Sequence, residues 1–320
     1  MSADANVDGA VADGAASPAH AGARSALQAT LIGFVAIGLW ALLAALTTLS
    51  GTVPPFQLSA MAFAVAGMIG MAWAWTRGGS DGLRRALPRR PLAWIVGVGG
   101  LFGYHAIYFT ALRLAPAVEA SLIAYLWPLL IVLLSALLPT ETLLPRHIIG
   151  ALIGLAGAVL IVIGPTGAAF EAQYLPGYVA AAMCALVWSG YSVASRALGD
   201  VPTEAVAAFC VATAVLALVA HVAFEQTVWP STPVQWLAVL GLGLGPVGGA
   251  FFVWDHGCKR GDIKVLGAAS YAAPVLSTLV LIGLGLAAFT PRVAVACLLV
   301  TLGAVVASGL LSRRASPQGA

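Results

Sequence analysis

A series of long apolar stretches, separated by short segments rich in proline, glycine and charge, dominates this sequence. Each stretch is long enough to cross the roughly 30 Å apolar core of a bilayer as a helix. The stretches cover residues 27–49, 56–76, 92–112, 117–138, 146–164, 176–196, 203–224, 234–257, 265–287 and 291–311. Charged residues make up 8% of the chain, against roughly 25% in soluble domains. We therefore predict an all-α polytopic membrane protein with ten transmembrane helices.

The basic residues are distributed unevenly between the two sides of this ten-span arrangement. Of the 15 Lys and Arg residues, all but Arg113 and Arg292 flank one side. Positive residues concentrate in cytoplasmic loops, so both termini are predicted to be cytoplasmic. The Arg-rich segment 77–90 could alternatively bind lipid or nucleic acid, but the charge asymmetry already explains it and no nucleic-acid partner is expected. Residues 1–26 and 312–320 are predicted to be tails, the first of them disordered.

The sequence also aligns with itself. A shift of 146 residues pairs Tyr125 with Tyr271, Pro128 with Pro274 and Gly303 with Gly157, and near the starts of the halves a shift of 144 pairs Gly33 with Gly177. The predicted repeats are 27–164 and 176–311. Because each repeat has an odd number of spans, the second should lie inverted relative to the first. Inverted repeats are typical of transporters that alternate access to a site near the midplane.

Glycine is concentrated in particular helices. The spacings Gly99-x-x-x-Gly103 and Gly150-x-x-x-Gly154 favour close helix packing. The segment 241–250 (GLGLGPVGGA) combines five glycines with a proline. It predicts a bent or partly unwound helix, which a membrane protein tolerates only where the backbone is buried or lines a cavity.

Aromatic residues with polar groups occur deep inside the apolar stretches. Tyr104, His105 and Tyr108 can share one helix flank, and Tyr125 and Trp127 precede Pro128, which loosens the helix. Trp40, Trp188 and Tyr271 also lie near span centres, away from the interfacial belt where Trp and Tyr usually gather. Polar groups at this depth should face a cavity, because exposing them to lipid is costly. Packing in the core is the alternative interpretation.

Intramembrane charge is scarce. Asp255 lies four residues before Lys259 near the end of the eighth span, and we interpret the two as an ion pair at the cytoplasmic end. If it lay deeper, Asp255 would be the leading candidate for proton coupling. Glu141 and the other carboxylates near the spans, Glu119, Glu204 and Glu225, are predicted to lie in loops or at helix ends.

No enzyme signature is present: the chain lacks a phosphate-binding loop, a paired-His metal motif and a Gly-x-Ser-x-Gly elbow. Its four cysteines form no CxxC and should be reduced and packed. We expect no metal and no cofactor. A membrane enzyme or receptor module would require a soluble partner or a catalytic group that these motifs do not reveal.

These features resemble the drug/metabolite transporter superfamily, in its EamA-type branch, over residues 27–311. More narrowly, Tyr104-His105-x-x-Tyr108 and Tyr125-x-Trp127-Pro128 resemble the aromatic amino acid exporters of that branch. The resemblance implies export of aromatic amino acids, and of related amphipathic metabolites, across a bacterial inner membrane. It further implies a central cavity lined by Tyr104, His105, Tyr108, Tyr125, Trp127, Pro128, Trp188 and Tyr271. Small multidrug relatives carry a Glu in their first span, which this chain lacks.

We therefore expect alternating access, transport down the substrate gradient and a monomer or weak homodimer in the bilayer. The alternative is an exporter of other metabolites or of cationic drugs, with or without proton coupling.

Overall fold

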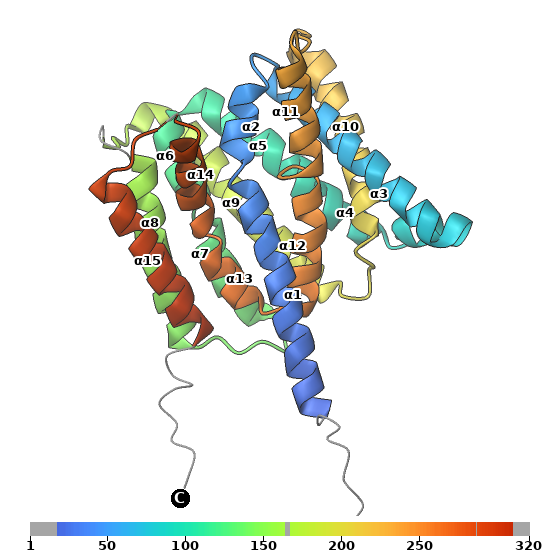
Figure 1. Cartoon of the computed structure of the whole chain (residues 1–320), viewed down its shortest axis with the longest axis horizontal. Helices are drawn as coiled ribbons and strands as arrows, with labels where there is room; N and C mark the ends of the chain where they lie inside the picture. The colour runs from blue at the N-terminus through green and yellow to red at the C-terminus, as the bar shows by residue number, and fades with distance from the viewer. Residues whose placement is uncertain (1–17, 164–166, 286, 310–320) are drawn as a thin grey trace, which may run out of the picture.

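The structure is a computed structural model that describes residues 18–163, 167–285 and 287–309, in which the regular elements are helices and no strand occurs (Figure 1). The first tail is predicted to extend to residue 26, but in the structure helix α1 already begins at Pro18. The segment that starts there is rich in alanine, which favours helix. Residues 1–17 and 310–320, which hold the rest of both predicted tails, lie outside the described residues.

Most spans begin and end close to their predicted limits. Nine helical stretches within the described residues are long and apolar enough to cross a membrane, and a pair bent by 41° supplies a tenth. In chain order the elements are α1 (Pro18–Trp40), α2 (Leu43–Leu49), α3 (Pro55–Ala86), α4 (Pro91–Val98), the π-helical η1 (Gly99–Gly103), α5 (Tyr104–Leu114), α6 (Ala117–Ala124), α7 (Trp127–Leu134), η2 (Ser135–Leu137), α8 (Pro145–Ile163), η3 (Ala172–Tyr174), α9 (Leu175–Ala197), α10 (Ala205–Phe224), α11 (Pro233–Leu244), α12 (Gly249–Arg260), α13 (Ile263–Ala269), α14 (Ala272–Gly283) and α15 (Pro291–Ser308).

Proline and hydroxyl side chains mark several helix starts. A proline occupies one of the first two positions of α3, α4, α11 and α15, where its missing N–H has no helical partner to lose. Thr232 and Gln235 form a reciprocal capping box at the start of α11. Helix α3 continues to Ala86, beyond its predicted end at residue 76, with non-helical backbone at Gly78 and Gly79.

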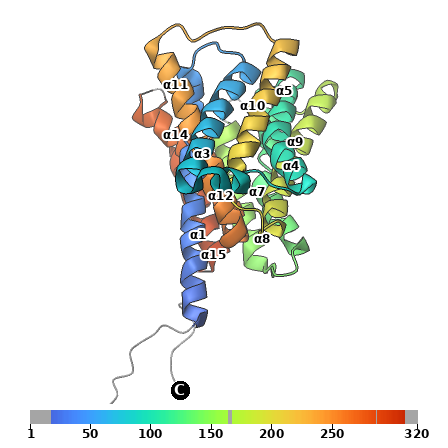
Figure 2. The same cartoon turned by 90° about the vertical axis from the view of Figure 1, so that its right-hand side faces the viewer.

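The helices pack in pairs that combine the two halves of the sequence. Helix α3 lies along α10, α8 along α15, α1 along α12, and α5 along α9 (Figures 1 and 2). The α8–α15 contact is close because glycines meet there: a Cβ on Gly150 would lie 2.5 Å from the carbonyl oxygen of Gly303. The packing role predicted for the glycine spacing is therefore confirmed on α8.

Both ends of the described chain lie at the same end of the molecule. Helix α1 begins and α15 ends at the bottom of Figures 1 and 2, whereas residues 225–232 cross the top. Large apolar residues cover much of the outer surface, with exposed fractions reaching 76% at Val222. This surface suits a hydrocarbon environment better than water.

Five spans are irregular near mid-height. Regular α-helix stops after Trp40, Val98, Ala124, Leu244 and Ala269, and it resumes after a gap of at most five residues in each case. The interruption predicted for the segment 241–250 is confirmed, since α11 ends at Leu244 and α12 begins at Gly249. These irregular segments place backbone polar groups around the centre of the molecule, where a cavity lies.

Candidate functional site

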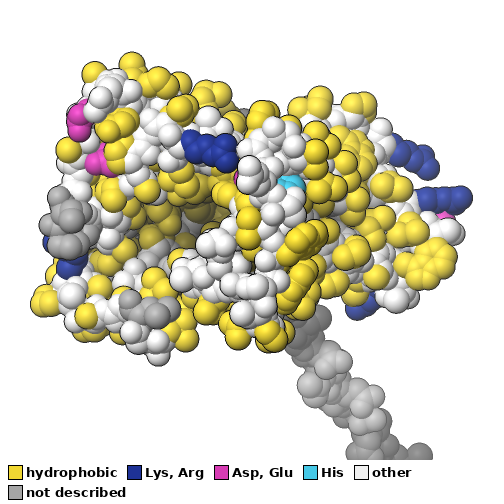
Figure 3. Space-filling view, turned by 90° about the horizontal axis from the view of Figure 1, so that it is seen from above, with side chains coloured by type: hydrophobic (Ala, Val, Ile, Leu, Met, Phe, Trp, Pro, Cys, Tyr) yellow, Lys and Arg dark blue, Asp and Glu magenta, His cyan; other side chains and the backbone are white. Residues whose placement is uncertain are grey.

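A cavity of about 500 Å³ occupies the centre of the helix bundle. This volume lies within the roughly 300–1,000 Å³ typical of small-molecule sites. The cavity opens at the top of the molecule, opposite the end where α1 begins (Figure 3). The described residues that line it are Trp40, Leu43, Ala44, Thr47, Thr48, Tyr104, His105, Tyr108, Ala124, Tyr125, Trp127, Trp188, Pro246, Val247, Phe251, Ala273 and Ser277. Aromatic rings and hydroxyl groups therefore dominate its surface, and none of these residues is Asp, Glu, Lys or Arg.

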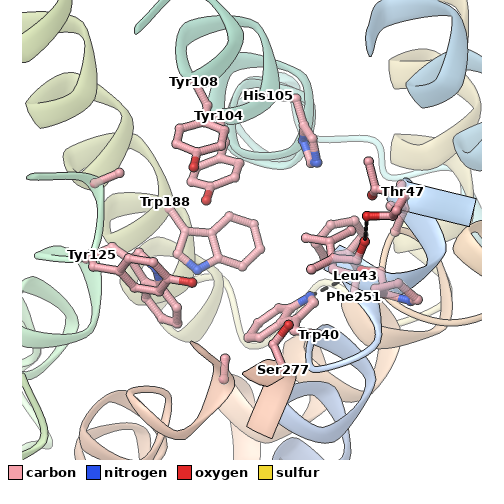
Figure 4. Close-up of a pocket in the computed structure, with 17 residues that line it drawn as sticks. Trp40, Leu43, Thr47, Tyr104, His105, Tyr108, Tyr125, Trp188, Phe251 and Ser277 are labelled. Carbon is pink, nitrogen blue, oxygen red and sulfur yellow. Dashed lines mark hydrogen bonds between the residues drawn. The ribbon is translucent and has the colours of Figure 1, made fainter. Parts of the chain in front are cut away.

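Tyrosines on α5 form one wall of the cavity (Figure 4). The rings of Tyr104 and Tyr108 stack with centroids 5.9 Å apart, and Tyr104 also contacts Trp188 at 5.2 Å. The hydroxyl groups of Tyr108 and Ser121 are hydrogen-bonded at 3.1 Å, which fixes the Tyr108 ring between α5 and α6. The predicted shared flank of Tyr104, His105 and Tyr108 thus faces the cavity.

His105 is oriented by the irregular segment that precedes α5. Its Nδ1 donates to the carbonyl oxygen of Leu101 in the π-helical segment, at 2.7 Å. In the neutral ring, the proton on Nδ1 leaves Nε2 as an acceptor. The ring packs edge-on against Phe63 at 5.2 Å. His105 can therefore offer an acceptor to a ligand in the cavity.

Four tryptophans close the cavity from below. We call Trp40, Trp127, Trp188 and Trp254 the tryptophan cluster; they come from α1, α7, α9 and α12. The ring centroids of every pair lie between 5.0 and 6.4 Å apart. Such pairs contribute about 0.5–1.5 kcal/mol each beyond the area that they bury. The cluster joins both halves of the sequence and separates the cavity from the lower half of the molecule.

The interruption between α11 and α12 supplies a polar contact to this cluster. Trp40 Nε1 donates to the carbonyl oxygen of Pro246 at 3.1 Å, an oxygen that lies between the two helices. Pro246 and Val247 also line the cavity. The glycine- and proline-rich segment thus contributes directly to the site, and interrupted helices commonly form binding sites in membrane transporters.

Two residues proposed from the sequence do not line this cavity. Tyr271 is fully buried, and its hydroxyl oxygen accepts a hydrogen bond from the backbone N–H of Leu129 at 3.1 Å. That N–H belongs to the first turn of α7 and lacks a helical partner. Pro128 is buried at the second position of the same helix. Both residues shape the interruption that carries Tyr125 and Trp127, and neither faces the cavity itself.

Asp255 lies below the tryptophan cluster, outside the cavity. The predicted pair with Lys259 is present, with Nζ and Oδ1 2.8 Å apart. Both side chains are buried near this end of α12, with exposed side-chain fractions of 7% for Lys259 and 2% for Asp255. Thr203 donates its hydroxyl to Asp255 Oδ2 at 2.7 Å, and Lys259 Nζ donates to the carbonyl oxygen of Val201 at 2.8 Å. Residues 201–203, between α9 and α10, thereby seal the pair from water.

A second group of buried charges accompanies this pair. Glu141, which follows span four, bridges Arg196 at the end of α9 and Lys264 on α13. Arg196 also donates to the carbonyl oxygens of Cys258 and Gly261, both at 2.8 Å. We call Glu141, Arg196, Lys264, Asp255 and Lys259 the ion-pair cluster. The loop position predicted for Glu141 is correct, but its role in joining the two halves of the chain was not predicted.

The sequence gives little indication that the remaining lining residues belong to the site. Trp40 lies near a span centre, yet it was not included among the proposed site residues. Phe251 and the nearby Trp254 belong to a helix that we interpreted mainly through its charged end. Thr47 and Ser277 each precede a threonine within an apolar span, and hydroxyls in helices commonly bond to their own helix backbone.

Comparisons with known proteins agree with this architecture. The chain matches the EamA-like transporter family over residues 26–163 and 175–309. It is 55% identical over 289 residues to a protein of Ancylobacter novellus named aromatic amino acid exporter YddG, covering 90% of this chain and 99% of the relative. A Salmonella typhimurium protein of the same name is 26% identical over 264 residues, covering 78% of this chain and 86% of the relative. A solved crystal structure with 53% identity matches with a TM-score of 0.86, covering 91% of this chain and all of that chain.

Proposed function

This chain belongs to the EamA-like transporter family, and on that premise we propose that it exports aromatic amino acids across the bacterial inner membrane. The observation that carries the proposal is the cavity: among the described residues, aromatic rings and hydroxyls line it and no Asp, Glu, Lys or Arg does. The names of two relatives, which are aromatic amino acid exporters, favour the same cargo. The family is one of transporters, not of enzymes.

We assign each part of the substrate to a part of the cavity. The aromatic ring would lie against Trp188 and Trp127, whose faces and edges suit offset or edge-on stacking. The ammonium group would lie over a tyrosine ring on α5 and donate to His105 Nε2. Hydroxyl donors near the cavity, such as Tyr125 and Ser277, would serve the carboxylate. Tyr104, His105, Tyr108, Tyr125, Trp127 and Trp188 are the proposed contact residues, with Trp40 added; Pro128 and Tyr271 act by positioning them.

We further propose that two inverted repeats alternate access to this cavity. The family matches two successive segments of the chain, and the helix pairs α3–α10 and α8–α15 each join corresponding spans of the two repeats. The irregular segment Gly99–Gly103 corresponds, by the shift that pairs Tyr125 with Tyr271, to the interruption after Leu244. Such symmetry supports rocking of one half against the other.

The orientation follows from the distribution of positive charge. With both termini in the cytoplasm, the open end of the cavity would face outward, and the ion-pair cluster would close the cytoplasmic end. Transport would then run down the substrate gradient, because no carboxylate lines the cavity to carry a proton. The cavity lies within one chain, so a monomer would suffice.

Counterflow in proteoliposomes tests this function. Vesicles are loaded with one unlabelled amino acid at a time, and uptake of labelled phenylalanine is followed with and without an imposed pH gradient. We expect phenylalanine, tyrosine and tryptophan loads to accelerate uptake, aliphatic loads to have no effect, and the gradient to make no difference. Acceleration by other metabolites or cationic drugs, or dependence on the gradient, would favour the alternative cargo or a proton-coupled exporter.

A further inference from the structure

Below the tryptophan cluster, the structure contains a buried hydroxyl without a hydrogen-bond partner. Tyr191 lies on α9 one turn beyond Trp188, the residue is 4% exposed, and its hydroxyl forms no hydrogen bond of normal geometry with the described residues. The side chain of Ser195, one turn further along the same helix, lies close enough to interact with this hydroxyl, but the geometry falls short of a normal hydrogen bond. Burying a hydroxyl without a partner is costly, so such groups call for an explanation.

The ring of Tyr191 is held in place from two sides. Its centroid lies 5.2 Å from that of Trp188, and a Cβ added to Gly100 would come within 2.4 Å of the ring. Gly100 belongs to the π-helical segment η1, where the absence of a side chain allows this contact. The ring therefore cannot simply rotate to bring its hydroxyl to a hydrogen-bond partner. The missing hydrogen bond is a property of this conformation of the protein.

The internal repeat indicates what this position does in the other conformation. The alignment that pairs Gly33 with Gly177 also pairs Thr47 with Tyr191 and Thr48 with Ser192, and the alignment of Tyr125 with Tyr271 pairs Tyr108 with Trp254. Thr47, Thr48 and Tyr108 all line the open cavity. Their counterparts also lie together: Trp254 Nε1 donates to Ser192 Oγ at 3.1 Å, next to Tyr191 on α9.

We infer that Tyr191, Ser192 and Trp254 line a second binding site for the same amino acid, on the ion-pair side of the tryptophan cluster. This site is closed here and forms when the ion-pair cluster separates and the two halves exchange conformations. Tyr191 then donates its free hydroxyl to the substrate carboxylate, while Ser192 and Trp254 already satisfy each other. The inference rests on the proposed function and gives it a cytoplasmic entry site.

The first test uses accessibility. Ser192→Cys is introduced after the four native cysteines have been replaced, and a membrane-impermeant thiol reagent is added to inverted or right-side-out membrane vesicles during phenylalanine exchange. We expect labelling from the cytoplasmic face only, and slower labelling when excess phenylalanine is present on that face. Thr213→Cys on α10 is the control, because Thr213 is equally buried and also lacks a partner but lies off the proposed path.

The second test uses transport by Tyr191→Phe, which keeps the packed ring and removes only the unpartnered hydroxyl. The half-saturating phenylalanine concentration is measured on each face in turn, with the opposite face saturated. On the cytoplasmic face it should rise about fivefold, because one hydrogen bond is lost. On the outer face it should stay unchanged. Thr213→Val, which also removes an unpartnered hydroxyl, should change neither value.

The outcomes separate the two claims. If the unmodified protein exchanges phenylalanine but Ser192→Cys is never labelled from the cytoplasmic face, the second site is refuted and the proposed function stands. Equal shifts on both faces for Tyr191→Phe, or none, refute it as well. If the unmodified protein exchanges no amino acid, the proposed function fails and the inference fails with it.

Discussion

The two ends of the central path are built from different chemistry. The open end presents hydroxyls and aromatic rings without a fixed charge, whereas the closed end is held by the buried ion-pair cluster. Removing one partner of a buried ion pair is strongly destabilising, yet an ion pair exposed to water contributes about 0–1 kcal/mol. The ion pairs can therefore hold this end closed while it is dry and contribute little once water enters, which would suit a closure that opens in each cycle of the proposed alternating access.

Glu141→Gln should have the largest effect, because Glu141 is the shared partner of Arg196 and Lys264. Loss of its charge leaves Arg196 without its carboxylate partner and leaves Lys264 to the more distant Asp262, whose Oδ1 lies 3.9 Å from Nζ, at a cost of about 3–5 kcal/mol. The apparent melting temperature in detergent should fall by about 10 °C. Glu171→Gln is the control, because Glu171 is exposed and its side chain accepts a hydrogen bond from Gln173, a neighbour in the same loop. An unchanged melting temperature for Glu141→Gln would mean that charge does not hold the closed end.

Asp255→Asn should have the next largest effect. Asparagine can still accept from Thr203, and Lys259 keeps the carbonyl oxygen of Val201, so the loss should be about 2 kcal/mol. Differential scanning fluorimetry would measure it. Because Asp255 does not line the cavity, counterflow by the variant should remain as insensitive to a pH gradient as that of the unmodified protein. If the unmodified protein responds to a pH gradient and the Asp255→Asn variant does not, Asp255 is instead assigned to proton coupling.

Trp127→Phe addresses the boundary between the two ends. Trp127 contacts Trp40, Trp188 and Trp254, and it also lines the cavity. Phenylalanine retains most of the buried apolar area but loses part of the ring contacts, so counterflow should slow about fivefold. The melting temperature should fall less than for Glu141→Gln. Trp229→Phe is the control, since Trp229 is 63% exposed and belongs to the segment 225–232, outside the cavity lining.

Tyr108→Phe should have the smallest effect. Its hydroxyl is hydrogen-bonded to Ser121 beside the open cavity, where water can replace it. The half-saturating phenylalanine concentration on the outer face should rise about twofold, with no change in melting temperature. A tenfold rise would show that the open end recognises its ligand through this single hydroxyl and would weaken the contrast between the two ends.

Much of the fold follows from local sequence patterns. Span length and hydropathy predict the ten crossings, and the glycines and Pro246 predict the interruption of the eighth span, because these residues act on their own backbone. The turn at Ala41 and Leu42 in the first span has no such mark. It depends on packing with distant helices, among them the hydrogen bond from Trp40 to Pro246, which local pattern cannot reveal.

The site follows from the sequence only in part. His105 and the tyrosines of α5 stand out because a polar ring in an apolar span needs a reason to be there. Tyr271 stands out for the same reason, but its hydroxyl serves a backbone N–H of another helix. Glu141 lies in a loop by sequence and is buried by contacts with residues far away in the chain. In each case the difference arises from tertiary contacts across the two halves.

The absence of charged side chains in the cavity lining has an electrical consequence. A zwitterionic amino acid carries no net charge, so a cycle through this cavity would move no charge across the bilayer, and membrane voltage would neither drive nor oppose it. A monovalent cation would instead be held inside by about 2.3 kcal/mol per 100 mV. That energy corresponds to a roughly fortyfold ratio of concentrations in favour of the cell interior. If transport is uncoupled, as we propose, this path would be suited to releasing amino acids and poorly suited to clearing cationic drugs from an energised cell.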